Sequence, residues 1–345
     1  MRFGLVGAGK IGALRAAAVR AQANAEIVAV FDVNQAAASK VAAGAPVFDG
    51  LEKFLDAPMD AVIISTPPHL HEEACLGAFS RGLHVLCEKP MASTVDAGRR
   101  MVEAARNHNR VLAVGFNFRY YPFVKFVRAA VDAGKIGNID HVRLFGGHDG
   151  LHNFSADWQY KMPHSGGGAM MDIGIHLSDL ARYFLGEVTR VSGVMSENIY
   201  KLPGSEDNAM AIYVNPEGVA ATYHATWAEW QGYEIAVEVY GDRGMVRGSY
   251  APMQNILIEK DSPTGPAKRT VKRYPEVMLR EKLKSWTSTA LITFEEEVRD
   301  FMAMVGGDAN TPLADGLAGL RSLEVAAAVR ESAKTGRTID LPPLR

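Results

Sequence analysis

The sequence predicts two domains: a doubly wound α/β domain with a parallel sheet, then a mostly antiparallel, open-sheet α+β domain. The chain has 345 residues, more than one hydrophobic core usually organises. As far as Phe118, apolar strands alternate with helical stretches, which is typical of a parallel sheet. Beyond that point, short strands separated by turns indicate antiparallel pairing. We therefore assign residues 1–120 to the first domain and 121–345 to the second.

The first domain is predicted from short apolar runs and the helical stretches between them. The expected strands are 2–6, 26–31, 61–65, 83–87 and 111–114, and the expected helices are 11–21, 69–80 and 93–107, the last capped by Ser93 or Thr94. Such apolar strands fit a parallel sheet covered on both faces. Right-handed crossovers bring the carboxyl ends of all these strands to one edge, where ligands bind in folds of this kind.

A glycine-rich turn follows the first strand with the spacing Gly-x-Gly-x-x-Gly, at Gly7, Gly9 and Gly12. Gly7 permits the tight turn, Gly9 lets backbone N–H groups approach a pyrophosphate, and Gly12 lets the helix pack on the strand. The helix N-terminus, including Lys10 and Ile11, adds partial positive charge for the phosphates. The turn alone is a common feature, but its position between a strand and a helix predicts a dinucleotide site.

An acidic residue completes this motif. Asp32 ends the second strand, twenty residues after Gly12, where its carboxylate is placed to accept hydrogen bonds from the adenosine ribose. A 2′-phosphate would be repelled there, and no Arg or Lys follows before Lys40. We therefore expect NAD(H) to be preferred over NADP(H). Other cofactor contacts are expected along the same sheet edge, at Thr66, Pro67, His71 and Glu88.

Composition excludes several classes of function. The net charge is −2, with 48% hydrophobic and 22% charged residues, so neither nucleic acid nor a membrane is expected as a partner. The two cysteines, Cys75 and Cys87, lie within predicted elements, which favours a reducing, cytoplasmic location. His69 and His71 have no cysteine or carboxylate at metal-ligand spacing, so no metal is expected.

The second domain begins with a helix over 122–133 that stops at Gly134. Its expected strands are 139–145, 188–197, 209–214, 220–227, 233–240 and 245–250, with a helix over 169–185 between the first two. Residues 258–284 are polar and basic, which indicates a solvated excursion or an oligomer arm. Trp227 and Trp230 are expected to pack in the sheet. The amphipathic helix over 315–334 is able to pack back on the first domain.

Two further motifs contain groups suited to acid–base chemistry. Lys89, in Glu88-Lys89-Pro90, would project from the binding edge of the sheet, although a lysine beside a glutamate is equally common on a solvated surface. Asp172 and His176, after the glycines at 166–168, are four residues apart and share one helix face. A neutral imidazole can accept a proton from an alcohol as hydride leaves the same carbon. Taken alone, such a pair is more often a helix-capping aspartate and a core histidine than an acid–base pair.

Together the motifs resemble the Gfo/Idh/MocA oxidoreductases. The matching segments are Gly7–Gly12 with Asp32, 66–71, Glu88-Lys89-Pro90, 167–176, the turn 241–244 and the tail 331–336. The resemblance implies a Rossmann domain, an open-sheet domain that makes the oligomer contact, and a catalytic set of Lys89, Asp172 and His176, with no metal. Pro68 departs from the family pattern, which often has Asn there, so a polar contact near the cofactor is in doubt.

Substrate contacts are expected from a loop rich in aromatic and polar side chains. Its aromatic and polar side chains could stack on a sugar ring and form hydrogen bonds with its hydroxyls; they are His152, Asn153, Trp158 and Tyr160. Arg119 is also expected to line the cleft. The expected function is an NAD-dependent sugar, inositol or polyol dehydrogenase that forms a homodimer or homotetramer. Two alternatives are a redox-neutral NAD-dependent glycosidase of the same fold and a non-catalytic NAD-binding sensor.

Overall fold

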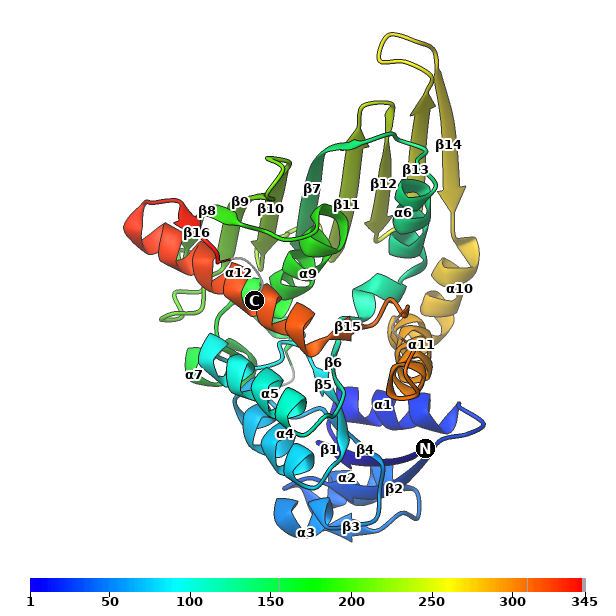
Figure 1. Cartoon of the computed structure of the whole chain (residues 1–345), viewed down its shortest axis with the longest axis vertical. Helices are drawn as coiled ribbons and strands as arrows, with labels where there is room; N and C mark the ends of the chain where they lie inside the picture. The colour runs from blue at the N-terminus through cyan, green and yellow to red at the C-terminus, as the bar shows by residue number, and fades with distance from the viewer. Residues whose placement is uncertain (155, 309, 343–345) are drawn as a thin grey trace. The chain divides into compact units, whose positions relative to one another are not determined.

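The computed structural model describes residues 1–154, 156–308 and 310–342 and divides into two compact units (Figure 1). Unit 1 comprises Met1–Tyr120 and Glu281–Leu323, and unit 2 comprises Tyr121–Arg280 and Glu324–Arg345. The chain leaves unit 1 at the predicted boundary. Glu281–Leu323 belongs to unit 1. The C-terminal helix was expected to be able to pack there, whereas the predicted extent of the second domain, 121–345, needs correction for residues 281–314.

Unit 1 is built on a seven-stranded sheet in the order β15-β6-β5-β4-β1-β2-β3. Its strands are β1 (Arg2–Val6), β2 (Glu26–Phe31), β3 (Val47–Phe48), β4 (Ala61–Ile64), β5 (His84–Glu88), β6 (Leu112–Gly115) and β15 (Ala314–Asp315). All pairs are parallel except β15 with β6, which is antiparallel. The order reverses at β1, so the carboxyl ends of β1 and β4 flank the crevice where such sheets bind dinucleotides.

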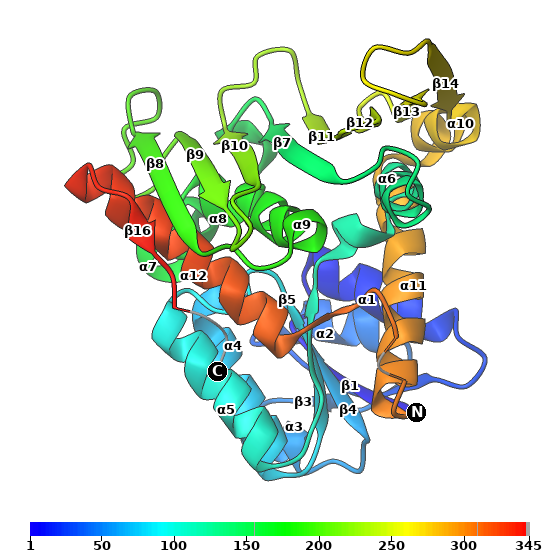
Figure 2. The same ribbon diagram turned by 45° about the horizontal axis from the view of Figure 1, so that its top comes forward.

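Helices cover both faces of this sheet. They are α1 (Lys10–Arg20), α2 (Gln35–Ala42), α3 (Leu51–Leu55), α4 (His71–Ser80), α5 (Val95–Asn107) and α11 (Thr287–Val305), with short 3₁₀ helices η1 (Pro68–Leu70) and η2 (Asn117–Tyr120). Figure 2 shows α4 and α5 on one side of the sheet and α1 and α11 on the other. Thr94 caps α5, because its hydroxyl accepts a hydrogen bond from the N–H of Ala97.

Helix α11 was not predicted. Its apolar side chains recur at helical spacing and are buried against α1 and the sheet: Ala290, Phe294, Val298 and Phe301. The periodic signal was therefore present in the sequence. Without a motif to connect this segment to the first domain, its place in the unit 1 core could not be foreseen.

Unit 2 contains a nine-stranded sheet in the order β14-β13-β12-β11-β7-β10-β9-β8-β16. Its strands are β7 (Ile139–Gly147), β8 (Arg190–Ser196), β9 (Asn208–Val214), β10 (Ala220–Thr226), β11 (Glu234–Gly241), β12 (Gly244–Tyr250), β13 (Gln254–Lys260), β14 (Ala267–Arg273) and β16 (Ile339–Asp340). Only β7 and β10 pair in parallel. The predicted mostly antiparallel sheet is therefore confirmed.

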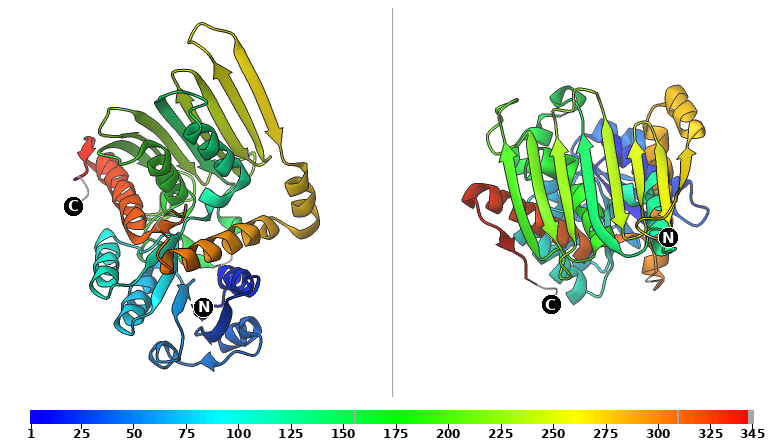
Figure 3. Two further views of the ribbon diagram at one scale, coloured as in Figure 1. Left: turned by 45° about the vertical axis from the view of Figure 1, so that its right-hand side comes forward. Right: turned by 90° about the horizontal axis from the view of Figure 1, so that it is seen from above.

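One face of this sheet is covered by helices, among them α6 (Pro122–Asp132) and α9 (Gly174–Leu185), which contact β12 and β10 respectively. The other helices of unit 2 are α7 (Met162–Ser165) and α8 (Ala169–Asp172), with η3 (Leu151–Asn153) and η4 (Asp157–Tyr160). Helix α10 (Pro275–Lys284) begins in unit 2 and ends in unit 1, and α12 (Gly316–Thr335) begins in unit 1 and ends in unit 2. Figure 3, right, looks onto the opposite face of the sheet. Three large apolar side chains are exposed on β8 and β9, at Val194, Met210 and Ile212; on β9 they alternate with the buried Ala209, Ala211 and Tyr213.

Two predictions for unit 2 are corrected. Residues 258–284, expected as a solvated excursion or an oligomer arm, form regular elements that were not predicted: the end of β13, the edge strand β14 and α10. Every residue of β14 is exposed, and four of its seven are Lys or Arg, which discourages pairing with another chain at a sheet edge. The helix predicted over 169–185 is divided at Ile173 into α8 and α9.

Candidate active site

The glycine turn after β1 has the geometry that its spacing predicted. Gly7 adopts φ +93°, and its N–H donates to the carbonyl of Phe31 at 2.9 Å. A Cβ on Gly12 would lie 1.9 Å from the Gly7 oxygen, whereas a Cβ on Gly9 would meet nothing within 4 Å. The absence of a side chain at Gly12 therefore lets the helix pack closely against the turn. At Gly9 it leaves open space beside the backbone.

The groups around this turn suit a dinucleotide. Gly9 is the N-cap of α1 and supplies no side-chain cap, so the first N–H groups of the helix can serve a phosphate. Asp32 accepts hydrogen bonds through Oδ2 from the N–H of Ala8 at 2.6 Å and through Oδ1 from the N–H of Asn34 at 2.7 Å. These bonds orient the Asp32 carboxylate beside the glycine turn.

Two hydroxyls at the end of β4 also fit a polar ligand. Ser65 Oγ and Thr66 Oγ1 are buried and lack a hydrogen-bond partner among the described residues, and buried polar groups are rarely left in this state. A Cβ on Gly7 would lie 2.7 Å from the Ser65 carbonyl. The backbone of Ser65 therefore lies directly beside the glycine turn, and the two hydroxyls belong to this segment. Thr66 was predicted from the sheet edge; Ser65 was missed, although the same reasoning applies to it.

His71 supports this segment from inside the protein. The side chain is fully buried, with Nε2 2.7 Å from the Thr66 carbonyl oxygen and Nδ1 3.2 Å from the Met91 carbonyl oxygen. Its Nδ1 is also 3.2 Å from the Sγ of Cys87, and burial raises the pKa of that thiol well above its usual value. His71 therefore contacts the Thr66 backbone from inside the protein, and its fully buried side chain leaves no exposed surface for the direct cofactor contact that was expected.

We predict that Gly9→Ala weakens NAD⁺ binding by about tenfold, equal to ~1.4 kcal/mol, and leaves the fold intact. The added methyl group would occupy the space that a pyrophosphate needs. Calorimetric titration with NAD⁺ measures the effect. Gly50→Ala is the matched control, because Gly50 is also a helix N-cap with nothing within 4 Å of its added Cβ. Equal NAD⁺ affinity in the two variants would contradict this assignment.

The Glu-Lys-Pro motif lies at the end of β5. Glu88 accepts a hydrogen bond from Arg15 Nε at 2.5 Å through Oε1 and one from the Lys89 N–H at 3.3 Å through Oε2. Lys89 itself is half-buried. Two other predicted residues contact the segment returning from unit 2: the Lys10 ammonium lies 4.5 Å from the Trp286 ring centroid, and Arg119 donates to the carbonyl of Pro312.

In unit 2, the carboxylate of Asp172 is held by two side chains. Its Oδ2 accepts hydrogen bonds from His148 Nε2 at 2.8 Å and from Trp227 Nε1 at 3.1 Å. His148 Nδ1 accepts a hydrogen bond from the N–H of Gly150, so the network assigns the imidazole proton to Nε2. Trp227 is fully buried; the sequence predicted only its packing, and its role as a hydrogen-bond donor to Asp172 was missed. Trp230 is 68% exposed, so its predicted burial was wrong.

His176 lies in the first turn of α9, and its side chain is buried, with 4% exposed. The division at Ile173 places Asp172 at the end of α8 and His176 near the start of α9. Gly174 between them allows a close approach to β10, because a Cβ there would lie 1.9 Å from the Tyr223 hydroxyl oxygen. The two predicted catalytic residues of unit 2 therefore come from separate short helices.

A buried carboxylate holds the glycine run before Asp172. Glu206 is fully buried and accepts hydrogen bonds from the N–H groups of Gly168 at 3.0 Å and Met170 at 2.9 Å. Burial raises the pKa of Glu206, and the nearby Arg330 opposes this effect. Arg330 also donates to the carbonyl of Gly166. The sequence did not reveal this pair, since Glu206 and Arg330 lie 38 and 164 residues from the glycines they hold.

Aromatic rings surround Asp172 and its partners. Phe154 packs edge-on against both His148 and Trp227 and lies 6.4 Å from Tyr160, between ring centroids. Of the predicted substrate residues, Trp158 and Tyr160 form part of η4, and His152 is paired with Asp149 at 3.2 Å. The side chain of Asn153 lies outside the described residues. Tyr160 also lines a hollow of about 320 Å³ with Lys161, Met162, Pro163, His164, Leu202 and Pro203.

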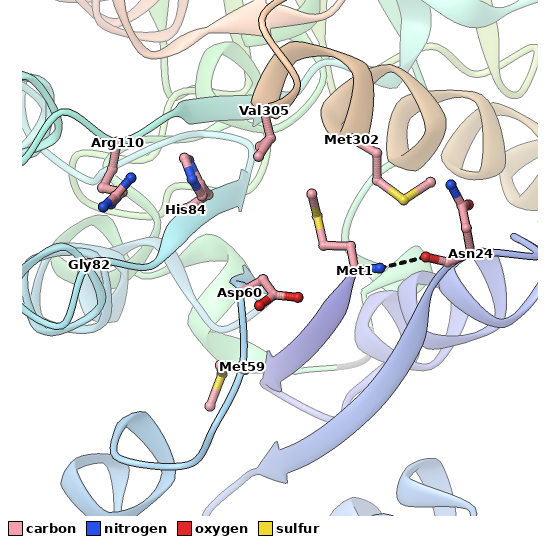
Figure 4. Close-up of a pocket in the computed structure, with 9 residues that line it drawn as sticks. All are labelled: Met1, Asn24, Met59, Asp60, Gly82, His84, Arg110, Met302 and Val305. Carbon is pink, nitrogen blue, oxygen red and sulfur yellow. Dashed lines mark hydrogen bonds between the residues drawn. The ribbon is translucent and has the colours of Figure 1, made fainter.

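A larger hollow in unit 1, about 590 Å³, lies at the edge of the parallel sheet formed by the amino ends of its strands, opposite the edge that carries the glycine turn (Figure 4). It is lined by Met1, Asn24, Met59, Asp60, Gly82, His84, Arg110, Met302 and Val305. Met1, Asp60 and His84 stand at the amino ends of their strands, whereas dinucleotides bind at the carboxyl ends. This hollow is therefore not the predicted nucleotide site.

Within 1–154, 156–308 and 310–342, no group of three or more His, Cys, Asp or Glu side chains is arranged to hold a metal ion. None of the helices described is both long and apolar enough to cross a bilayer.

Comparison with known proteins connects both units to one family. Residues 1–116 match the model described as "Oxidoreductase family, NAD-binding Rossmann fold", and residues 124–247 match the "GFO/IDH/MocA C-terminal domain". Inositol 2-dehydrogenase of Rhizobium meliloti is 32% identical over 77% of this chain and 81% of its own. 1,5-Anhydro-D-fructose reductase of Ensifer adhaerens is 29% identical over 99% and 98%. A levoglucosan dehydrogenase solved with NADH and levoglucosan is 25% identical, with a TM-score of 0.85 over 99% of this chain and all of that one.

Proposed function

The chain belongs to the GFO/IDH/MocA family of NAD-binding oxidoreductases, and we propose that it transfers hydride between nicotinamide and a secondary alcohol or ketone of a sugar, inositol or related polyol. The observation that carries the proposal is the Asp172 carboxylate, fixed by His148 and Trp227 four residues before His176. A residue that only caps a helix does not need two side-chain donors, here from the residues that directly follow β7 and β10. The named relatives act on inositol, levoglucosan and an anhydro-sugar, which supports a cyclic polyol substrate.

Each catalytic residue has a distinct role in the proposed reaction. His176 accepts the proton of the substrate hydroxyl on its imidazole during oxidation and returns it during reduction. Asp172, oriented by its two donors, positions the substrate and stabilises the imidazolium that forms. Lys89 donates a hydrogen bond to the reacting oxygen and polarises it. NAD⁺, when bound, supplies the hydride acceptor.

The aromatic loop of unit 2 supports a sugar-like ring as the substrate. Phe154 and Tyr160 offer faces and edges for the C–H groups of a ring, while Trp158 and His152 add polar atoms. We propose that these residues distinguish one ring stereochemistry from another.

The proposed function is tested by NADH absorbance with purified protein, NAD⁺ and a panel of inositols, aldoses, anhydro-sugars and sugar acids. A rise with one ring stereochemistry is the expected result. Consumption of a glycoside without net NADH would instead favour the redox-neutral glycosidase. Binding of NAD⁺ with no conversion of any compound would favour the sensor.

We propose that NAD(H) is preferred over NADP(H), because Asp32 would face the 2′-phosphate. Repulsion between the Asp32 carboxylate and a 2′-phosphate disfavours NADP(H). We therefore expect NAD⁺ to bind at least about tenfold more tightly than NADP⁺, a difference of ~1.4 kcal/mol in binding free energy. Asp32→Ser should reduce that ratio. Calorimetric titration of both cofactors against both proteins measures it, with Asp49→Ser, an exposed carboxylate on the same unit, as the control. A ratio unaffected by Asp32→Ser would refute the role of this carboxylate.

We further propose a homodimer or homotetramer that forms through the uncovered sheet face of unit 2. The exposed Val194, Met210 and Ile212 supply apolar area for a second copy. We also propose a cytoplasmic location, which the two free, buried cysteines support. The near-neutral net charge supports the absence of nucleic acid and of a membrane as partners.

A further inference from the structure

Unit 1 buries a complete guanidinium beside the Glu-Lys-Pro motif. Arg15, in the middle of α1, has no exposed surface. Its Nε donates to Glu88 Oε1 at 2.5 Å and its Nη1 to Glu297 Oε2 at 2.7 Å, and its Cζ lies 4.0 Å from the Phe294 ring centroid. A buried charge of this kind requires close partners, because its loss of hydration is costly.

The hydrogen bonds from this cation lead to the backbone of Lys89. Glu88 uses its second oxygen, Oε2, to accept from the Lys89 N–H at 3.3 Å. Glu297, Arg15, Glu88 and the Lys89 peptide thus form one chain of contacts across α11, α1 and β5. Arg15 fixes Glu88, and Glu88 fixes the residue from which the Lys89 side chain extends.

A glycine on the neighbouring strand makes room for this chain of contacts. Gly115 pairs with Glu88 in the register of β5 and β6. A Cβ there would lie 2.3 Å from Arg15 Nη2 and 3.3 Å from both carboxylate oxygens of Glu88. Any larger residue would displace the guanidinium or the carboxylate, so the position of the pair depends on Gly115.

We propose that Arg15 and Glu297 are positioning residues that set the orientation of Lys89 through Glu88. The assignment of a catalytic consequence rests on the proposed hydride transfer, in which Lys89 contacts the reacting oxygen. The geometric part, a line of contacts from the buried Arg15–Glu297 pair through Glu88 to the Lys89 backbone N–H, stands on the observed hydrogen bonds alone. Neither Arg15 nor Glu297 belongs to any motif that the sequence offered.

The charge of the network changes near neutral pH. Burial raises the pKa of Glu297 to about 7, although Arg15 opposes this effect. The groups that face Glu297 are Arg15 from α1, Glu88 from β5, and Arg119 and Tyr120 from η2. Below this pKa, Arg15 pairs with one carboxylate; above it, Glu297 and Glu88 share the guanidinium. The hold on Glu88, and with it the environment of Lys89, should change over this range.

The test compares Arg15→Lys and Glu297→Gln with wild type in two measurements. The first is kcat, expected to fall by about 10- to 100-fold in Arg15→Lys, a loss typical of a misplaced catalytic group, while the Kd for NAD⁺ changes little. The second is the NMR signal of the Lys89 side chain in protein with carbon-13-labelled lysine, assigned by its loss in Lys89→Met. Arg20→Lys is the matched control, because Arg20 lies on the same helix and donates to the Val41 and Ala42 carbonyls.

The Lys89 signal should shift in Arg15→Lys and not in Arg20→Lys. In wild type it should also move as the pH passes through the Glu297 pKa of about 7, and this movement should be absent in Glu297→Gln. A Lys89 signal unchanged in both variants, with only a lower Tm, would show that the pair is purely structural and overturn the proposal. If Arg15→Lys does not fold, the isosteric Glu297→Gln decides.

The two proposals can fail separately. Absence of turnover with every compound of the panel would refute the proposed function, while the Lys89 signal would still report whether Arg15 and Glu297 control this side chain. Turnover in wild type with an unshifted Lys89 signal in both variants would refute the positioning role alone.

Discussion

His176→Ala is expected to lower kcat by about 10²- to 10⁴-fold, the range for loss of a general acid–base group, with the Kd for NAD⁺ close to that of wild type. His176 is in unit 2, whereas the glycine turn and Asp32 are in unit 1, so the substitution leaves the residues proposed to bind the cofactor unchanged. Steady-state kinetics with the substrate from the panel, and calorimetric titration with NAD⁺, measure the two quantities.

His176 is only 4% exposed, so alanine also leaves a cavity. His176→Asn fills more of the space and cannot act as a base, and it should lose activity to a similar extent. His141→Ala is the control, since His141 lies at the other end of β7 from His148 and stacks on Tyr240. Turnover near the wild-type rate in both His176 variants would exclude this residue as the acid–base group.

Lys89→Met is expected to reduce kcat by about 10²- to 10³-fold, comparable to removing one donor that stabilises charge on a reacting oxygen. Methionine preserves most of the length of the side chain and removes its charge and its three donors. Glu88 accepts hydrogen bonds from the Lys89 backbone N–H and from Arg15. Neither bond involves the lysine side chain, so both are expected to remain in Lys89→Met. Kinetics and NAD⁺ titration measure the effect, with the exposed Lys53→Met as the control.

Lys89→Arg distinguishes two roles for the lysine. Arginine retains the positive charge but is not deprotonated in proteins and has a different donor geometry. If Lys89 must give or take a proton, Lys89→Arg should be as impaired as Lys89→Met. Recovery of most of the activity in Lys89→Arg would show that positive charge suffices, and full activity in Lys89→Met would remove Lys89 from the catalytic set.

The nucleotide half of the site could be predicted from sequence because its determinants are local. Gly7, Gly9, Gly12 and Asp32 occur within one strand–helix–strand unit, and backbone geometry fixes their relation. The alternation of strands and helices likewise predicted the parallel sheet. The boundary after residue 120 followed from the change of pattern, and the helix over 315–334 was expected to be able to pack back on the first domain. The return of residues 281–314 to unit 1 was not expected, because that segment is distant in sequence.

The contacts that support the proposed catalytic residues could not be predicted in the same way. His148 is 24 residues from Asp172 and Trp227 is 55, and only the folded sheet brings their donors to one oxygen. Arg15 occurs in a helix of mostly small apolar residues, where an arginine is normally taken to be exposed. Glu297, 282 residues away, supplies the charge that allows Arg15 to be buried.

Periodicity also misled in one place. The apolar pattern from Ala169 to Leu185 continues across Ile173, so it predicted one helix. The structure has two, and Gly174 at the division lies against Tyr223 and Ala225 of β10. Packing against the sheet thus decided a boundary that helical spacing did not mark.

The most direct test of the proposed hydride transfer uses the substrate from the panel with deuterium on the carbon that bears the reacting hydroxyl. The enzyme is incubated with this compound and NAD⁺, and the reduced cofactor is examined by mass spectrometry. The account predicts that the reduced nicotinamide carries the deuterium, since hydride passes from that carbon to the cofactor. Substrate conversion without deuterium in the reduced cofactor would contradict it.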